Sequence, residues 1–156
     1  MEKFSLRPAT EEDLSKIGKI ERQAHLAPWT EENFRQELEK PFSHILVMTD
    51  DETDSMIAGY IVFWFMYEDC HILDLAVDLP YRGLGFARQM VRQAVTLAEK
   101  KGLYKIFLEV RKTNHAAIQL YQSLNFTITH VHKSFYSNGE DAYQMTLDLK
   151  GDGISF

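Results

Sequence analysis

Two hydrophobic periodicities alternate along the chain, one typical of strands and one typical of helices. Short runs that are apolar throughout, or that alternate apolar and polar residues, predict strands at residues 3–8, 44–50, 56–67, 70–77, 105–111, 126–136 and 142–149. Segments with apolar residues three and four apart predict helices at residues 10–24 and 85–102, and cap residues predict shorter helices at residues 30–40 and 114–125. The resulting order, β-α-α-β-β-β-α-β-α-β-β, predicts an α/β fold with a mixed sheet and helices on both faces.

Polar residues at the ends of the helical segments support these boundaries. Thr10 and Thr30 each precede a pair of acidic residues, which is the pattern of an N-cap followed by a first helical turn. Asn114 can cap the last helix in the same way, and Asn125 can end it. Gly102 stands where the long third helix is expected to stop.

The chain has 156 residues, of which 45% are hydrophobic and 26% charged, a composition typical of a globular protein. We expect a single domain over residues 1–150, with a flexible tail at 151–156. A single cysteine, Cys70, leaves no internal disulfide and fits a reducing compartment. The first residues carry neither the apolar region of a signal peptide nor a run of membrane length, so a soluble, cytoplasmic protein is expected.

Charge is distributed unevenly along the chain. The net charge of -6 arises in residues 1–55, which carry 7 basic and 13 acidic side chains, whereas residues 56–156 carry 10 of each. A protein without a basic surplus is not expected to bind nucleic acid. The acidic segment suits a cationic acceptor, although solvated helices explain it equally well.

The stretch YRGLGFARQM, residues 81–90, joins a predicted strand to a predicted helix. Glycines between a strand and a helix start allow backbone N–H groups to approach an anion, and the helix dipole favours negative charge there. Arg82 and Arg88 flank this loop. Its spacing is neither that of a P-loop nor that of a dinucleotide fingerprint, so an anion cradle and an ordinary turn both remain open.

Two further side chains are candidates for acid–base chemistry. Alternation along residues 105–111 places Glu109 on the face opposite Leu108, where it is either a solvated or ion-paired carboxylate or a general base. Tyr121 shares a helix face with Ile118 and is either a core residue or a proton donor. Cys70 is expected to be a buried apolar side chain. The six histidines show no zinc-binding spacing, so no metal is expected.

These motifs, taken together and in order, resemble those of the GCN5-related N-acetyltransferases, in particular the bacterial ribosomal-protein-alanine N-terminal acetyltransferases. RGLGFA resembles the loop that holds the pyrophosphate of acetyl-CoA, and LEVRKTNHAAIQLYQSLNF resembles a block of the same family. PWTEENF and SFY…GEDAYQMTL resemble elements of the N-terminal acetyltransferase subgroup. The similarity covers residues 3–149. It implies a mostly antiparallel sheet of six to seven strands with a splayed central pair.

The resemblance also implies roles for individual residues. Glu109 falls at the position of the proton acceptor and Tyr121 at that of the proton donor. The backbones of Leu75 and Val77 are expected to pair with the pantetheine arm of acetyl-CoA. The Val77 N–H is expected to polarise the thioester carbonyl, and residues 83–88 to hold the pyrophosphate. Trp29 and Tyr136 are expected to line the acceptor groove, although Trp29 is equally explained as a packing residue at a helix start. The implied acetyl-CoA-binding set is Leu75, Ala76, Val77, Arg82, Gly83, Leu84, Gly85, Phe86, Ala87, Arg88 and Asn114.

By this resemblance the chain is an acetyl-CoA-dependent N-acetyltransferase that transfers acetyl directly to a primary amine. The expected acceptor is the N-terminal α-amine of a protein, of the ribosomal-protein-alanine type. Two alternatives are a small amine (a polyamine, an amino acid or an aminoglycoside) and a non-catalytic acyl-CoA-binding sensor. Expected partners are acetyl-CoA and a protein or peptide N-terminus, with no nucleic acid or membrane, for a monomer or weak homodimer.

Overall fold

The computed structural model describes residues 3–149, and the predicted flexible tail at 151–156 lies outside the described residues. The described part of the chain forms two compact units. Among the described residues, unit 1 comprises residues 3–64 and 74–93, and unit 2 comprises residues 65–73 and 94–149. The assignment of residues 1–150 to a single domain stays a prediction.

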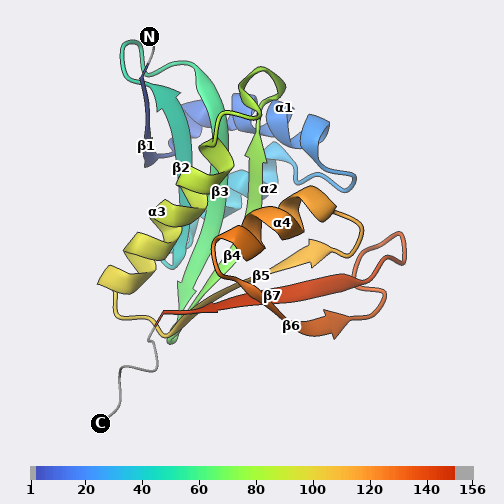
Figure 1. The fold of residues 1–156 in the computed structure, drawn as a ribbon. Coiled ribbons are helices and arrows are strands. Elements are labelled where there is room, and N and C mark those ends of the chain that lie inside the picture. The colour runs from blue at the N-terminus through green and yellow to red at the C-terminus, as the bar shows by residue number, and fades with distance from the viewer. Residues whose placement is uncertain (1–2, 150–156) are drawn as a thin grey trace. The chain divides into compact units, whose positions relative to one another are not determined.

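Seven strands and four α-helices make up the described chain (Figure 1), and this confirms the predicted fold class. The strands are β1 (Phe4–Pro8), β2 (Ser43–Asp50), β3 (Ile57–Met66), β4 (Asp69–Val77), β5 (Lys105–Arg111), β6 (Thr127–His132) and β7 (Ala142–Asp148). The helices are α1 (Leu14–Ala24), α2 (Glu31–Glu39), α3 (Phe86–Lys100) and α4 (His115–Ser123), with short 3-10 helices η1 (Glu11–Asp13) and η2 (Leu79–Tyr81). None of the described helices is both long and apolar enough to cross a membrane.

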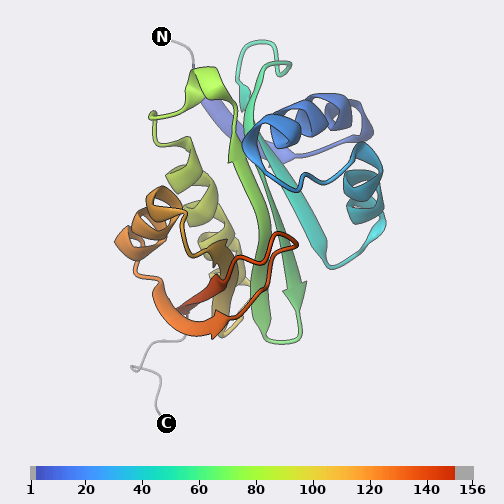
Figure 2. The ribbon, with the colours of Figure 1, turned by 90° about the vertical axis from the view of Figure 1, so that its right-hand side faces the viewer.

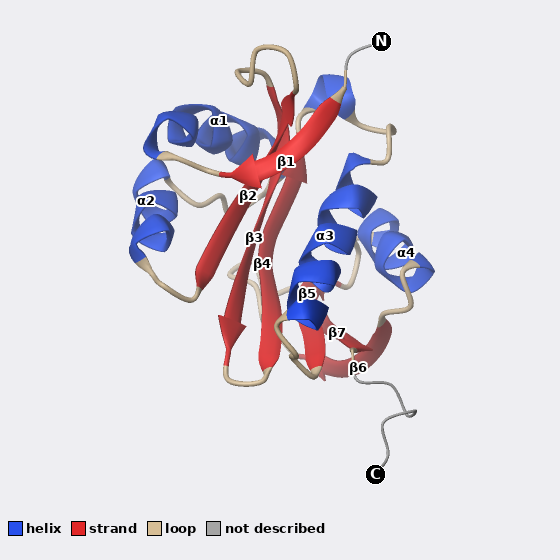
Figure 3. Cartoon of the chain, turned by 90° about the vertical axis from the view of Figure 1, so that its left-hand side faces the viewer, coloured by secondary structure: helices blue, strands red, loops and turns tan. Residues whose placement is uncertain are grey.

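Unit 1 contains the strand order β1-β2-β3-β4, in which β1, β2 and β3 pair antiparallel. Helices α1 and α2 lie next to each other on one side of β2 and β3 (Figure 3). They bury an apolar stripe that includes Leu14, Ile17 and Phe34, each at most 1% exposed. Phe34 meets the ring of Tyr60 on β3 edge-on, with 5.6 Å between ring centroids. The predicted 3.6-residue periodicity therefore identifies the packed face of α1 correctly.

Side-chain caps fix where the helices of unit 1 begin. Thr30 Oγ1 accepts a hydrogen bond from the Asn33 N–H, and Asn33 Oδ1 accepts one from the Thr30 N–H, as in a capping box. Asp13, the last residue of η1, accepts hydrogen bonds from the Thr10 N–H and from the Arg7 guanidinium. Burial raises the pKa of Asp13, but the hydrogen bonds from Arg7 and Thr10 outweigh it and lower the pKa below its usual value. Asp13 is thus held ionised at the start of the helical region.

Unit 2 contains the strand order β4-β5-β7-β6. The first residues of β4 pair with β5 in parallel, from Asp69 opposite Lys105 to Ile72 opposite Leu108. The other pairs, β5 with β7 and β6 with β7, are antiparallel. Along β5 the buried residues are Ile106, Leu108 and Val110, as the alternation predicts.

The last hairpin corrects one predicted boundary. A strand was expected over residues 126–136, but β6 ends at His132, and a loop connects it to β7 (Figure 2). Ser134 has a positive φ of 50°, which an extended strand does not accommodate. Its N–H donates to Asp141 Oδ1 at 2.9 Å and so fixes the turned loop. Phe135 and Tyr136 are residue types that favour strands, and for this reason the sequence extended the predicted strand beyond its actual end.

A close approach between two backbones in unit 1 requires glycine at position 59. A Cβ added to Gly59 on β3 would lie 2.6 Å from the carbonyl oxygen of Ala76 and 3.3 Å from the Cα of Val77, both on β4. Neither obstacle is a flexible side chain, so the backbone of β4 would have to move. Gly59 therefore lets β3 and β4 approach closely at Ala76 and Val77.

Gly59→Ala is expected to lower the free energy of unfolding by about 1–3 kcal/mol, because overpacking a close contact shifts the surrounding backbone. Urea denaturation followed by circular dichroism measures this loss. Ile61→Val in the same strand is the control, since it removes one buried methyl group and displaces nothing. An unchanged denaturation midpoint for Gly59→Ala would show that β4 accommodates the added methyl group.

Candidate active site

The loop between β4 and α3 has the backbone conformation that only glycine adopts readily. Gly83 and Gly85 have φ values of 78° and 86°, in the left-handed region. A Cβ built on either would meet no other atom within 4 Å, so the conformation, and not crowding, requires glycine here. The loop ends directly at the start of α3, with Leu84 62% exposed. The open space over the loop and the adjacent helix N-terminus fit the binding of a pyrophosphate.

The end of β4 and Arg82 are connected in unit 1. Arg82 Nε donates to the carbonyl oxygen of Val77 at 3.0 Å, so this arginine holds the end of the strand next to the loop. The Leu75 N–H donates to Asp74 Oδ1 at 2.9 Å, and the Leu75 carbonyl oxygen lies 3.2 Å from His25 Nε2. Both backbone groups of Leu75 thus have partners, and a pantetheine arm that pairs with Leu75 has to compete with them.

Glu109 lies on β5 in unit 2, on the face opposite the buried residues. Its side chain is 17% exposed, and Oε1 lies 2.7 Å from His71 Nε2 on β4. The His71 ring stacks on Phe107 with 4.3 Å between centroids, which fixes the imidazole. Glu109 is therefore a half-buried carboxylate held by a histidine, an arrangement compatible with both an ion pair and a positioned base.

Tyr121 lies on α4 in unit 2, and Asn114 is the residue directly before this helix. Tyr121 is 7% exposed, and its ring packs on Phe126 with 5.7 Å between centroids. Asn114 Oδ1 accepts a hydrogen bond from the Ala117 N–H at 3.2 Å, so the predicted cap is confirmed. Asn125, with φ of 73°, takes the left-handed conformation expected at the end of this helix.

The two aromatic residues expected at the acceptor groove have different surroundings. Trp29 directly precedes the Thr30 cap, and its ring lies 5.2 Å from that of Phe34, which makes the pair a hydrophobic staple. The Arg111 guanidinium lies 3.9 Å over the ring of Tyr136 in unit 2. Burial raises the pKa of Tyr136 above its usual value, and Glu109 adds to this against the opposing effect of Arg111. The contact with Phe34 therefore supports a packing role for Trp29. Tyr136 lies near the charges of Arg111 and Glu109.

Sequence reasoning missed two sets of charged residues. His71 becomes relevant only because parallel pairing places it beside Phe107 on β5, near Glu109. Asp74 falls on the buried face of β4, as the alternating burial of that strand shows. A charged residue at an apolar position of the alternation was the signal that could have identified Asp74.

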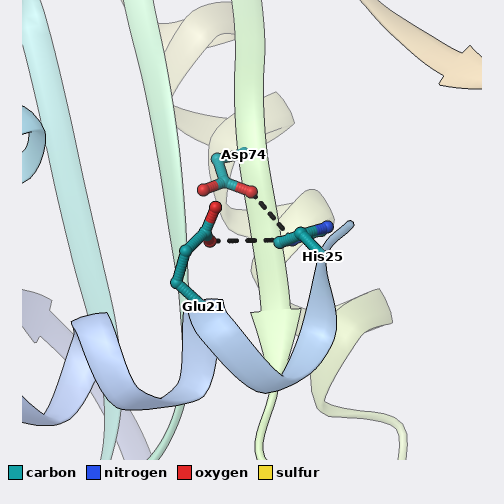
Figure 4. A group of neighbouring side chains, drawn as sticks. All are labelled: Glu21, His25 and Asp74. Carbon is teal, nitrogen blue, oxygen red and sulfur yellow. Dashed lines mark ion pairs between the residues drawn. The ribbon is translucent and has the colours of Figure 1, made fainter. Parts of the chain in front are cut away.

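Asp74 meets two residues at the end of α1, Glu21 and His25 (Figure 4). Burial and the nearby Asp74 carboxylate raise the pKa of Glu21 to about 8. Glu21 Oε2 accepts from the Trp29 N–H at 3.0 Å, and Oε1 accepts from the Tyr60 hydroxyl. Glu21 thus joins α1 to the segment before α2 and to β3.

The order of elements, the glycine loop before α3 and the block that follows it define the class of protein. A family model described as "Acetyltransferase (GNAT) family" matches residues 14–126, and the chain belongs to this family. It is therefore an N-acetyltransferase, an enzyme. The predicted family and the predicted enzyme class are both confirmed.

Individual relatives are similar over nearly their whole lengths. A Bacillus subtilis (strain 168) protein, provisionally named [ribosomal protein bS18]-alanine N-acetyltransferase, is 35% identical over 149 residues, 94% of this chain and 97% of the relative. The crystal structure of the Escherichia coli ribosomal-protein-S18-alanine N-acetyltransferase is 27% identical with a TM-score of 0.85, covering 99% of this chain and 100% of that one. Arabidopsis thaliana NAA60 in complex with acetyl-CoA shares the fold, with 19% identity, a TM-score of 0.86, and coverage of 96% and 100%.

Proposed function

We propose that this protein transfers the acetyl group of acetyl-CoA to the N-terminal α-amine of a protein, of the ribosomal-protein-alanine type. The observation that carries the proposal is the similarity to the bS18-alanine acetyltransferases, which extends over at least nine tenths of this chain for the Bacillus subtilis and Escherichia coli proteins. The family alone supports acetyl transfer to an amine, and the relatives support the protein terminus as acceptor.

In this proposal the loop after β4 binds the pyrophosphate of acetyl-CoA. Gly83 and Gly85 leave the loop backbone uncovered, and the N-terminus of α3 contributes a favourable dipole. When bound, acetyl-CoA supplies the acetyl group as an activated thioester. In the proposal the Val77 N–H donates a hydrogen bond to the carbonyl oxygen of that thioester, because this oxygen gains negative charge during the reaction.

Two side chains of unit 2 are assigned the proton transfers. The acceptor amine attacks only after losing a proton, and Glu109 accepts that proton directly or through a water molecule. A carbon–nitrogen bond forms, the carbon–sulfur bond breaks, and the departing thiolate takes a proton from the Tyr121 hydroxyl. With a reference pKa of about 10 the phenol is protonated at neutral pH, and its transfer of a proton to a thiolate whose conjugate thiol has a pKa of about 8.5 is uphill by only about 1.5 pKa units, or roughly 2 kcal/mol. Asn114 keeps its expected role in binding acetyl-CoA and also caps α4. Trp29 and Tyr136 keep their expected role of lining the acceptor groove.

The test offers the purified protein acetyl-CoA and a panel of amines, and follows CoA release with a thiol reagent. The protein's own Cys70 is buried, and burial raises the pKa of its thiol to about 12, so it contributes no background. The panel contains a peptide that begins with alanine and copies a bS18 N-terminus, the same peptide with its terminus blocked, spermidine and an aminoglycoside.

We expect CoA release only with the unblocked peptide, and mass spectrometry should place one acetyl group on its terminal alanine. Equal release with the blocked peptide would move the acceptor to a lysine side chain. Release with spermidine or the aminoglycoside alone would identify a small-amine enzyme. If no amine supports release while calorimetry still detects CoA binding, the acetyl transfer itself is wrong and a binding module is indicated.

A further inference from the structure

A partly buried cluster in unit 1 is not used by the proposed reaction. Glu21 lies in the last turns of α1, His25 directly follows that helix, and Asp74 lies on β4 (Figure 4). One potential ligand atom from each of the three lies within 4.8 Å of the other two. The chain thus brings one imidazole and two carboxylates to a single point from segments about fifty residues apart.

The spacing of these donors is that of a small coordination shell. His25 Nε2 lies 3.0 Å from Asp74 Oδ1, 3.7 Å from Glu21 Oε1 and 3.2 Å from the carbonyl oxygen of Leu75. Nitrogen and oxygen ligands around zinc lie at about 2.0–2.2 Å, which places the corners of a tetrahedron about 3.3 Å apart. The three distances, all measured from His25 Nε2, scatter around that value, as expected if the imidazole occupies one corner of such a shell.

A second observation points to a missing ligand. Asp74 Oδ2 is buried and has no hydrogen-bond partner among the described residues, and the Asp74 side chain is only 5% exposed. Figure 4 shows its carboxylate directed toward Glu21 and His25. A buried carboxylate oxygen without a partner is unfavourable, and beside a second buried carboxylate it calls for either a metal ion or a proton shared between the two. Glu21, only 1% exposed, is that second carboxylate.

We propose that Glu21, His25 and Asp74 bind a divalent transition-metal ion of the zinc class, with the Leu75 carbonyl oxygen as fourth ligand. A mixed imidazole and carboxylate set suits zinc and its neighbours, whereas magnesium and calcium take oxygen ligands. Four ligands from the protein fill a tetrahedral shell, so the ion is structural and leaves no position for a substrate.

Neighbouring groups already hold these ligands in place. The Tyr60 hydroxyl and the Trp29 N–H donate to the two oxygens of Glu21, and the Leu75 N–H donates to Asp74. Such outer hydrogen bonds orient metal ligands in known sites. The ion ties the C-terminal end of α1 to β4 at Leu75, the first residue of the strand segment assigned to the pantetheine arm. It therefore stabilises unit 1 whether or not the acetyl transfer proposal holds.

The test titrates Zn²⁺ into tag-free, chelator-treated protein by calorimetry and records the visible absorption of the Co²⁺ form. We expect one ion per chain, an intense Co²⁺ spectrum typical of tetrahedral ligation, and a melting temperature raised by roughly 5 °C at Zn²⁺ concentrations about 100 times Kd. Asp74→Asn keeps the shape of the side chain and should weaken Zn²⁺ binding by at least about 100-fold, because loss of a ligand exceeds the 10–100-fold effect of losing an outer partner.

Controls separate this site from others. His130→Gln alters an exposed histidine that stacks on His132 in unit 2, and Zn²⁺ affinity should not change. Circular dichroism of metal-free Asp74→Asn verifies that it folds, and His25→Gln, at a partly exposed position, provides a second loss of ligand. The proposal is overturned if no saturable Zn²⁺ binding occurs, or if Asp74→Asn and His25→Gln bind Zn²⁺ as tightly as the wild type. A proton on His25 then supplies the positive charge between the carboxylates.

Discussion

Tyr121→Phe is expected to lower kcat by about 100-fold or more, because a positioned acid contributes about 10²–10⁴ to rate. Phenylalanine keeps the ring that packs on Phe126 and removes only the hydroxyl. The KM for acetyl-CoA should stay within about twofold of the wild-type value, since an interaction made only in the transition state changes kcat and not substrate binding. Initial rates of CoA release at saturating peptide measure both constants.

Tyr104→Phe is the matched control, because this tyrosine lies in unit 2 and is 51% exposed. It removes a hydroxyl of the same chemistry from a position without an assigned role, and its kcat should equal that of the wild type. A Tyr121→Phe enzyme with an unchanged kcat would end the assignment of this phenol as proton donor. A loss of kcat together with a lowered melting temperature would instead indicate a core tyrosine.

Local patterns predicted the secondary structure well because the forces that set it are local. Alternation along β5 identified Ile106, Leu108 and Val110 as its buried face, and cap residues such as Thr30 and Asn114 act where they were expected. The strand predicted over residues 126–136 was too long. The positive φ of Ser134 accompanies its hydrogen bond to Asp141, and the pattern of apolar and polar residues does not reveal such a contact.

Contacts across the sheet could not be predicted in the same way. The pairing of His71 with Glu109 follows from the parallel register of β4 and β5, which no local pattern encodes. The cluster of Glu21, His25 and Asp74 likewise depends on where the end of α1 meets β4. The resemblance to a family supplied the roles of Glu109 and Tyr121 as proton acceptor and proton donor, because it compares aligned positions. It did not supply their neighbours.

Glu109→Gln is expected to lower kcat/KM by about 10²–10⁴-fold, the range of a lost general base. Glutamine has nearly the same shape and can keep a hydrogen bond to His71, which lies 2.7 Å from Glu109 Oε1. The loss should depend on pH. An N-terminal amine has a pKa of about 7.7–8.0, so below that range the wild type must deprotonate its bound substrate, whereas the variant depends on the amine fraction already neutral.

The ratio of wild-type to variant kcat/KM should therefore grow by about tenfold for each pH unit below the amine pKa of about 7.7–8.0, and level off above it. Rates of CoA release between mildly acidic and mildly alkaline pH give this profile. Glu99→Gln, an exposed carboxylate on α3, is the control and should follow the wild type throughout. A constant ratio at every pH would assign Glu109 to the positioning of His71 or the substrate and would leave proton removal to water. A ratio that rises toward low pH requires the carboxylate itself, because His71 remains in both enzymes.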